Sequence, residues 1–240
     1  MSDRNRSSDV REMPSPSRIE AFSDGVFAII ITLLVLDLRV PRTDALNGQT
    51  LAATLLQQWP LYLAYVLSFL QVGVVWANHH TMFHYIHRSD HVLLVCNLLL
   101  LLCTALLPFT TAVFAEYALA GGADMQLAAF IYSAALGAAG IFFNVLWRHA
   151  LRTGLTNPNA DPHRLHALGW HWMFVPILYG VAFILTFISP YLSVCIYVLL
   201  LFYYALPGPS VIRWITGRRA RRSVRGLIEP RRVGINRRLK

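Results

Sequence analysis

Long stretches of this chain carry no charged side chain, and they predict how it is organised. No Asp, Glu, Lys or Arg occurs within four runs, which are 45–87, 91–115, 125–147 and 165–212. A helix needs about 20 mostly apolar residues to cross a bilayer core. Helices are favoured in lipid because they satisfy their backbone groups internally. The pattern predicts an all-α integral membrane protein with six transmembrane helices, at about 18–39, 53–77, 91–115, 126–148, 169–188 and 191–207.

The ends of this six-helix region are marked by changes in composition. Residues 1–17 are polar, and no apolar segment there precedes a cleavage site, so we expect a polar N-terminus without a removable signal peptide. Ser189-Pro190 predicts the break between the last two helices, because proline disfavours helical geometry in the residue before it. We therefore expect a transmembrane domain over 18–207 and a basic tail over 208–240.

Composition and cysteine content exclude several classes of protein. Of the 240 residues, 56% are apolar and 14% are charged, whereas soluble domains carry about 25% charged residues. A soluble enzyme, a disordered chain and a nucleic-acid module with a long basic arm are therefore excluded. Cys96, Cys103 and Cys195 all lie in apolar stretches, so we expect small buried side chains and no disulfide.

The basic residues predict how the chain is oriented. If both termini are cytoplasmic, 19 of the 21 Lys and Arg residues lie on that side, and only Arg39 and Arg42 lie on the other. This asymmetry satisfies the positive-inside rule and predicts a multi-pass protein of the cell membrane with both termini inside. Eleven of these charges lie within 213–240, directly after an apolar block. We expect them to meet anionic lipid headgroups rather than nucleic acid.

The first helix carries polar residues that are unusual in lipid. Ser17 and Glu20 have the spacing of a capping box, which predicts a helix beginning near Arg18. Asp24 lies nearly two turns inside that helix, where an ionised group is costly and normally faces the protein or water. We expect Asp24 and Ser23 to fix helix packing. The expected donors end the second helix and belong to Trp76, Asn78, His79 and His80.

A stripe on the same helix has a different character. Its members follow i, i+4, i+7, i+8 and i+11 spacing and are Gly25, Ile29, Thr32, Leu33 and Leu36. On a single helix this stripe is a packing face. In a symmetric oligomer it could line an axis, where large apolar residues would form narrow rings that gate by dewetting and Thr32 would add a ring of hydroxyls.

The sequence Arg18-x-x-x-Phe22-Ser23-Asp24-Gly25, followed by an Ile/Thr/Leu run to Leu38, resembles the signature of the transmembrane protein 175 family of potassium channels. The resemblance covers roughly 15–205 and includes the Trp-x-Asn-His stretch. It implies a homotetramer of a six-helix channel domain, with the first helices around a central pore and potassium ions as the permeant species. It also implies a filter without backbone carbonyls.

The resemblance further implies roles for individual residues. Ile29 forms the narrowest ring, and Thr32, Leu33 and Leu36 complete the pore lining. A network holds the pore helix to the second and third helices, and its members are Arg18, Phe22, Ser23, Asp24, Trp76, Asn78 and His79. Some relatives have Leu where this chain has Ile29, and the basic tail is an addition to the family pattern. Since aliphatic rings cannot replace a hydration shell, we expect modest selectivity for potassium over sodium.

Five of the nine histidines cluster in 79–91. His80, His84, His87 and His91 have spacing that could place them on one helical face, and three readings stay open. They could lie in an interfacial loop, sense pH, or ligate a metal in a histidine-dependent membrane metalloenzyme. A proton-coupled transporter using Asp24 is a further alternative. We favour a channel that is not an enzyme and holds neither metal nor cofactor.

Aromatic residues near the predicted span ends are typical membrane-interface anchors. They are Trp59, Tyr62, Trp76, Trp147, Trp170 and Trp172.

Overall fold

The computed structural model describes residues 14–41 and 50–205, and nearly all regular structure in them is helical. The exception is one isolated bridge between Ile86 and Thr156. The elements are α1 (Pro16–Leu33), η1 (Leu34–Asp37), α2 (Leu51–Gln57), α3 (Trp59–Tyr85), α4 (His91–Ala105), α5 (Leu107–Tyr117), α6 (Gly122–Arg152), α7 (Pro162–Leu185) and α8 (Pro190–Ala205). Apart from the last two residues of α8, these elements belong to one compact unit, Met1–Tyr203. The predicted basic tail, 208–240, lies outside the described residues.

Five helical segments of the described chain are long and apolar enough to cross a membrane. They are Pro16–Asp37, Trp59–Tyr85, His91–Tyr117, Gly122–Arg152 and Pro162–Leu185. The all-helical fold with several candidate membrane spans is therefore confirmed. The element α8 has only 16 residues, or about 24 Å of helix, against about 30 Å of hydrocarbon core. A sixth crossing remains a prediction.

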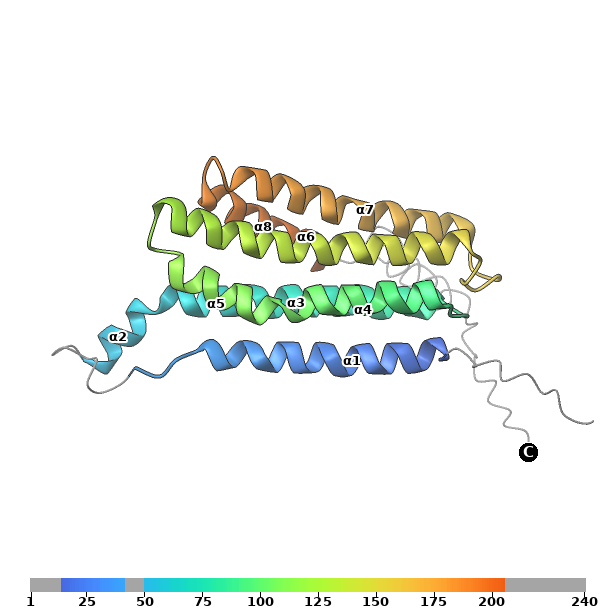
Figure 1. Ribbon diagram of the computed structural model, residues 1–240, viewed down its shortest axis with the longest axis horizontal. Coiled ribbons are helices and arrows are strands. Elements are labelled where there is room, and N and C mark those ends of the chain that lie inside the picture. Colours follow the sequence, from blue (N-terminus) through green and yellow to red (C-terminus); the bar gives the residue numbers. More distant parts are fainter. Residues whose placement is uncertain (1–13, 42–49, 206–240) are drawn as a thin grey trace, which may run out of the picture. The chain divides into compact units, whose positions relative to one another are not determined.

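The helices pack in a defined order (Figure 1). The helix α1 packs mainly against α3 and α4, while α4 and α5 contact α6, and α6 contacts α7. Within the described residues, these helices cover one side of α1 and leave its other side exposed.

The first helix begins earlier than its sequence predicts. Its N-cap is Ser15, and Pro16 occupies a first-turn position, where a missing N–H costs nothing. Ser15 and Ser17 pair through their hydroxyls at 3.0 Å, and no side chain caps the helix. The predicted capping box is wrong because the N-cap is Ser15, so Ser17 lies inside the helix, and Glu20 pairs with His80 on α3.

Two helix ends also differ from prediction. The regular helix α1 ends at Leu33 and continues as a 3₁₀ turn, rather than running to residue 39. The helix α3 runs to Tyr85, eight residues past its predicted end. His79, His80 and His84 are therefore helical, so an interfacial loop is wrong for these three.

Prolines shape α7 and α8. Pro176 lies inside α7 and cannot donate to the carbonyl of Trp172 four residues earlier. The Nδ2 atom of Asn144 on α6 donates to that carbonyl at 2.8 Å, so the defect becomes an interhelix contact. The break at Ser189-Pro190 is confirmed, because α7 ends at Leu185 and α8 begins at Pro190.

Two expectations about side chains need correction. Trp147 and Trp172 are fully buried, with ring centroids 5.1 Å apart, so they pack in the core and are not interfacial anchors. All three cysteines are free, but only Cys96 is buried, whereas Cys103 is half-buried and Cys195 is exposed.

Candidate functional site

The first helix has two sharply different faces. Its buried face carries Ile19, Ser23, Phe27 and Ile30, and Leu34 continues it into the 3₁₀ turn. These positions recur every three or four residues, so they lie along one side of the helix. This side attaches α1 to α3 and α4.

The opposite face of α1 is apolar and open. Phe22 is 56% exposed, Ile29 59% and Leu36 72%, and Leu33 is exposed as well. Gly25 and Thr32 are exposed on the same face. Every member of the predicted stripe is therefore uncovered in the single chain. An apolar surface of this kind favours either lipid or a protein partner.

Thr32 adds a polar group to this surface. Its hydroxyl donates to the Ile29 carbonyl at 2.8 Å. Since the hydrogen is used in that bond, the oxygen keeps its lone pairs for other partners. Thr32 can therefore present acceptors among aliphatic side chains.

A directed chain of hydrogen bonds fixes the buried face. Nε2 of His79 contacts Oδ1 of Asn97 at 2.8 Å, and Nδ2 of Asn97 donates to Ser23 Oγ at 2.9 Å. The Ser23 hydroxyl then donates to the carbonyl of Ile19 at 2.8 Å. Because Asn97 Oδ1 can only accept, the network assigns the proton of His79 to Nε2. All three side chains are fully buried and link α3, α4 and α1.

Aromatic rings hold the imidazole of this chain in place. His79 stacks on Phe83 with centroids 4.5 Å apart and meets the edge of Phe27 at 5.3 Å. A ring fixed on two sides has little rotational freedom. The hydrogen-bond chain therefore begins from a rigid donor.

A second pair of contacts joins α1 to α3 nearer the surface. The Trp76 indole donates to Asp24 Oδ1 at 2.9 Å, and Nδ1 of His80 lies 2.9 Å from Glu20 Oε1. Glu20 and Asp24 are four residues apart on α1, and Trp76 and His80 are four residues apart on α3. The two contacts are therefore stacked one turn apart between antiparallel helices. The predicted partner of Asp24 is confirmed for Trp76.

The anchoring contacts of α1 thus form two rows, one buried and one nearer the surface. A model of the family described as "Endosomal/lysosomal potassium channel TMEM175" matches 18–108. A potassium channel of Chamaesiphon minutus is 44% identical over 196 residues, which cover 81% of this chain and 96% of that protein. The chain belongs to the TMEM175 family.

A second relative and a solved structure support this assignment to the TMEM175 family. A potassium channel of Streptomyces collinus is 42% identical over 202 residues, covering 82% of this chain and 97% of that protein. The crystal structure of a lysosomal potassium-selective channel TMEM175 homolog from Chamaesiphon minutus superposes with a TM-score of 0.72 at 42% identity. It covers 79% of this chain and 96% of that one. The relatives are named as channels, so the family is one of channels and not of enzymes.

Three residues of the predicted network lie elsewhere in this TMEM175 chain. Arg18 is exposed and forms no ion pair within the described residues. Phe22 lies on the open face of α1. Asn78 accepts from the indole of Trp172 at 3.1 Å, so it contacts α7 rather than α1.

One essential member of the network was missed from the sequence. Asn97 is an isolated amide inside the uncharged run 91–115, and that contrast is its only signal in the sequence. A buried amide in an apolar helix requires hydrogen-bond partners. Its partners, Ser23 and His79, are 74 and 18 residues away along the chain, so only the fold identifies them.

The histidine cluster does not share one face. The helix ends at Tyr85, so His87 lies in a loop and His91 starts α4. His80 pairs with Glu20, while His84 packs edge-on against Tyr85. In residues 14–41 and 50–205, no group of three or more His, Cys, Asp or Glu side chains could hold a metal ion.

The loop after α3 pairs with the loop after α6. The amides of His87 and Arg88 donate to the carbonyl of Leu155, and Asn157 donates its amide to the carbonyl of Tyr85. Ser89 donates its hydroxyl to the carbonyl of Pro14, just before α1 begins. These contacts link the start of α1 to the far end of α6.

Asp90 completes this junction. Burial by itself would raise the pKa of its carboxyl. The hydrogen bonds from Leu93 and His149, together with the charges of His149 and His91, outweigh that effect and hold the pKa below its ordinary value. Asp90 is therefore a carboxylate at neutral pH.

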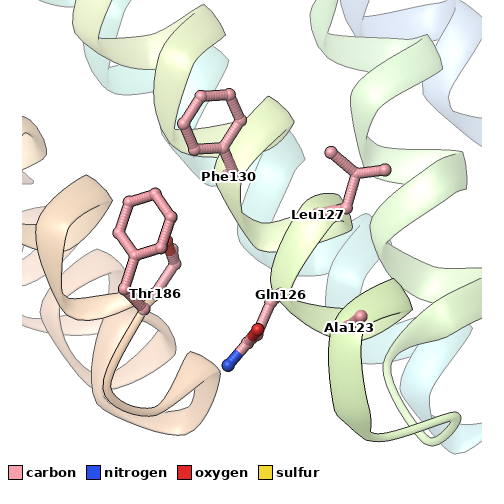
Figure 2. A pocket seen from close by; sticks show the side chains of 6 residues that line it. Ala123, Gln126, Leu127, Phe130 and Thr186 are labelled. Carbon is pink, nitrogen blue, oxygen red and sulfur yellow. The ribbon is translucent and has the colours of Figure 1, made fainter.

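The opposite end of α6 borders an open pocket of about 350 Å³. Figure 2 shows Phe130, Leu127 and Gln126 of α6 around it, with Thr186 following α7 across from them. Its walls are mainly apolar. It is separate from the anchoring network, whose residues lie on α1, α3 and α4.

Proposed function

We propose that the chain forms a potassium-permeable channel, as a homotetramer in which four copies of α1 surround a central pore. The open stripe of α1 carries this proposal, because Ile29, Leu33 and Leu36 are large, apolar and uncovered. Burial of such a surface against symmetry copies would leave one edge of it along the axis. Relatives that span nearly the same length are named potassium channels, which supports the same ion.

We place the constriction at Ile29, with Thr32, Leu33 and Leu36 completing the lining. A ring of isoleucines offers no oxygen to replace hydration water, so an ion passes only by partial dehydration. Potassium holds its water less tightly than sodium and should pass more easily. The free lone pairs of Thr32 supply the acceptors nearest to this ring. We expect modest selectivity for potassium over sodium.

We assign Ser23, Asp24, Trp76 and His79 to holding the pore helix, together with Asn97. Their hydrogen bonds lie on the side of α1 away from the stripe. A pore helix fixed from behind keeps its apolar side chains at a constant distance from the axis. Arg18 and Phe22 are exposed in the single chain, so we assign them to contacts between copies.

We also propose six crossings with both termini cytoplasmic, with α8 as the sixth. An even number of crossings keeps the basic tail on the same side as the other arginines, as the positive-inside rule requires. The tail would then face anionic headgroups. At 16 residues, α8 is shorter than the hydrocarbon core, and a bilayer that thins beside it would accommodate the crossing.

We keep pH sensing by His80, His84, His87 and His91 as a proposal. His80 gives it the clearest basis, because protonation would strengthen its pairing with Glu20 on the pore helix. Currents should then change between pH 8 and pH 5.5. Substitution of His80 by Gln should reduce that change, and unchanged wild-type currents over this range would refute the proposal.

Potassium flux from proteoliposomes tests the channel directly. We expect wild-type protein to pass potassium in preference to sodium. Ile29→Asn should conduct more and discriminate less, because a polar ring removes the dewetting barrier. Val35→Asn is the matched control, since Val35 is also exposed on this segment but lies on another side. Absence of flux above empty liposomes, from folded wild-type protein, would refute the channel.

A further inference from the structure

A small cavity lies between α3, α5, α6 and α8, away from the pore helix. Its volume is about 20 Å³, and Ser68, Gln71, Phe114, Tyr132 and Tyr197 are among the residues around it. A cavity needs roughly 10–15 Å³ of this volume to hold one water molecule. The space therefore fits one water and nothing much larger.

The hydroxyl groups beside the cavity have one more hydrogen to donate than they have acceptors among themselves. Thr111 donates to Ser68 Oγ at 2.8 Å, and Ser68 Oγ lies 3.1 Å from the hydroxyl of Tyr132. Three hydroxyls thus share two hydrogen bonds. If Ser68 donates to Tyr132, the Tyr132 hydrogen has no acceptor among the described residues. If Tyr132 donates to Ser68, the Ser68 hydrogen has none. All three side chains are buried, so bulk solvent cannot supply that acceptor.

The side-chain amide of Gln71 lacks a hydrogen-bond partner at the same cavity. It is 6% exposed and lines the cavity, yet its side-chain amide has no hydrogen bond within the described residues. Burial of an unpaired amide in apolar surroundings is costly. Tyr197 lies across the cavity, where its hydroxyl pairs with Ser133 Oγ and lies 3.2 Å from the Ala129 carbonyl. Whichever of the two hydroxyls donates, the Tyr197 oxygen keeps at least one lone pair for another donor.

We propose that one ordered water molecule occupies this cavity and bridges α3 to α6 and α8. The water accepts from the unpaired hydroxyl and from the Gln71 amide, and it donates to the oxygen of Tyr197. Three hydrogen bonds are typical of a buried water. The site is a structural hydration site, and it stands independently of the channel function.

The hydration site is tested by whether a substitution of Gln71 lowers or raises the melting temperature. Gln71→Met keeps the length of the side chain and removes its amide. If the water is present, the substitution deprives it of one partner, and the melting temperature of the full chain in detergent should fall by about 2–4 °C. If the cavity is dry, the substitution removes an unpaired buried amide and the melting temperature should rise. The matched control is Gln57→Met, because Gln57 is exposed on α2, and it should change little.

A high-resolution structure of the wild-type chain in lipid nanodiscs provides the second measurement. We expect one density peak within hydrogen-bonding distance of Gln71 and of Ser68 or Tyr132. A rise or no change in the melting temperature, or an empty cavity in the map, would overturn the proposal. Several oxygens much closer to the peak than a hydrogen bond would instead indicate a cation and would also overturn it. If Gln71→Met does not fold, the map alone decides.

Discussion

The Nε2 atom of His149, near the end of α6, lies 2.6 Å from Oδ2 of Asp90 at the start of α4. The other carboxylate oxygen of Asp90 accepts from the amide of Leu93 at 2.8 Å and caps α4. The neighbouring Ser89 donates its hydroxyl to the carbonyl of Pro14, two residues before α1 begins at Pro16. One short loop therefore joins the ends of α6, α4 and α1.

Asp90→Ala should destabilise the protein by about 1–2 kcal/mol, because it removes both a helix cap and a charge-assisted hydrogen bond. Asp90→Asn should cost less, since its oxygen can still cap α4. Thermal unfolding in detergent measures both. Asp161→Ala is the matched control, since Asp161 caps α7 through the amide of His163 and is exposed. A loss at Asp90 no greater than at Asp161 would contradict a role for the His149 contact.

Asp90 also predicts a dependence on pH. The pKa of its carboxyl is lowered in the folded protein, so the folded state binds its proton less readily than the unfolded state does. Its stabilising contribution is complete above about pH 4 and is lost as the pH falls through the lowered pKa. The gap in unfolding temperature between wild type and Asp90→Asn should therefore narrow from pH 5 to pH 3. A constant gap would show that the carboxylate charge contributes nothing.

Asn97→Ala should be among the most damaging substitutions, at about 2–4 kcal/mol. It leaves the Nε2–H of His79 without an acceptor, and removes the donor to Ser23, in a fully buried place. The free energy of unfolding in a graded denaturant series measures this loss. Asn159→Ala, at an exposed loop position, should stay within about 0.5 kcal/mol of wild type. Equal effects at both positions would exclude the network as a stabilising element.

Trp76→Phe should loosen the pore helix without unfolding the chain. It removes the 2.9 Å hydrogen bond to Asp24 and keeps an aromatic ring, so we expect a loss of about 1–2 kcal/mol. Potassium flux per folded protein should change as well, since α1 would be less firmly held. Trp170→Phe is the control, because Trp170 is 62% exposed. If both variants match wild type in stability and flux, the Asp24 contact does not anchor the helix.

Gly154→Ala should destabilise by about 1 kcal/mol. Gly154 has φ of 67° directly after α6, and Leu155 donates its amide to the Ala150 carbonyl at 3.0 Å, as in a Schellman motif. A Cβ would meet no atom within 4 Å, so only backbone strain opposes it. Gly180→Ala, inside α7 and equally unobstructed, should instead stabilise slightly. Unfolding temperatures of the two variants should therefore move in opposite directions.

Much of the helical pattern follows from hydrophobicity alone. Uncharged runs located the long helices because lipid excludes unpaired charge, and Pro190 located the start of α8. The ends were less predictable. Nothing in His79-His80 stops a helix, so α3 continues past them. It ends at Tyr85, where Ile86 and the residues after it pair with the loop after α6. The predicted capping box failed because the helix begins after Ser15, and Glu20 pairs with His80, a residue 60 positions away along the chain.

The site was predictable in part for the same reason. Helical periodicity placed Ile29, Thr32, Leu33 and Leu36 on one stripe, and the cost of a carboxylate in lipid required a donor for Asp24. Periodicity within one helix could not indicate which face another helix covers. The family resemblance placed Arg18, Phe22 and Asn78 in the anchoring network, and neither the resemblance nor the periodicity indicated Asn97.

The sequence by itself determined that the chain lies in a membrane, where its helices run and which stripe of the first helix is apolar. Those properties depend on local composition and on the fixed geometry of a helix. Only the tertiary structure decided that His79, Asn97 and Ser23 form one chain of hydrogen bonds ending on the backbone of α1. Hydrogen bonds require atoms within about 3 Å of one another, and the packing of α1 against α3 and α4 brings these three distant residues to that distance.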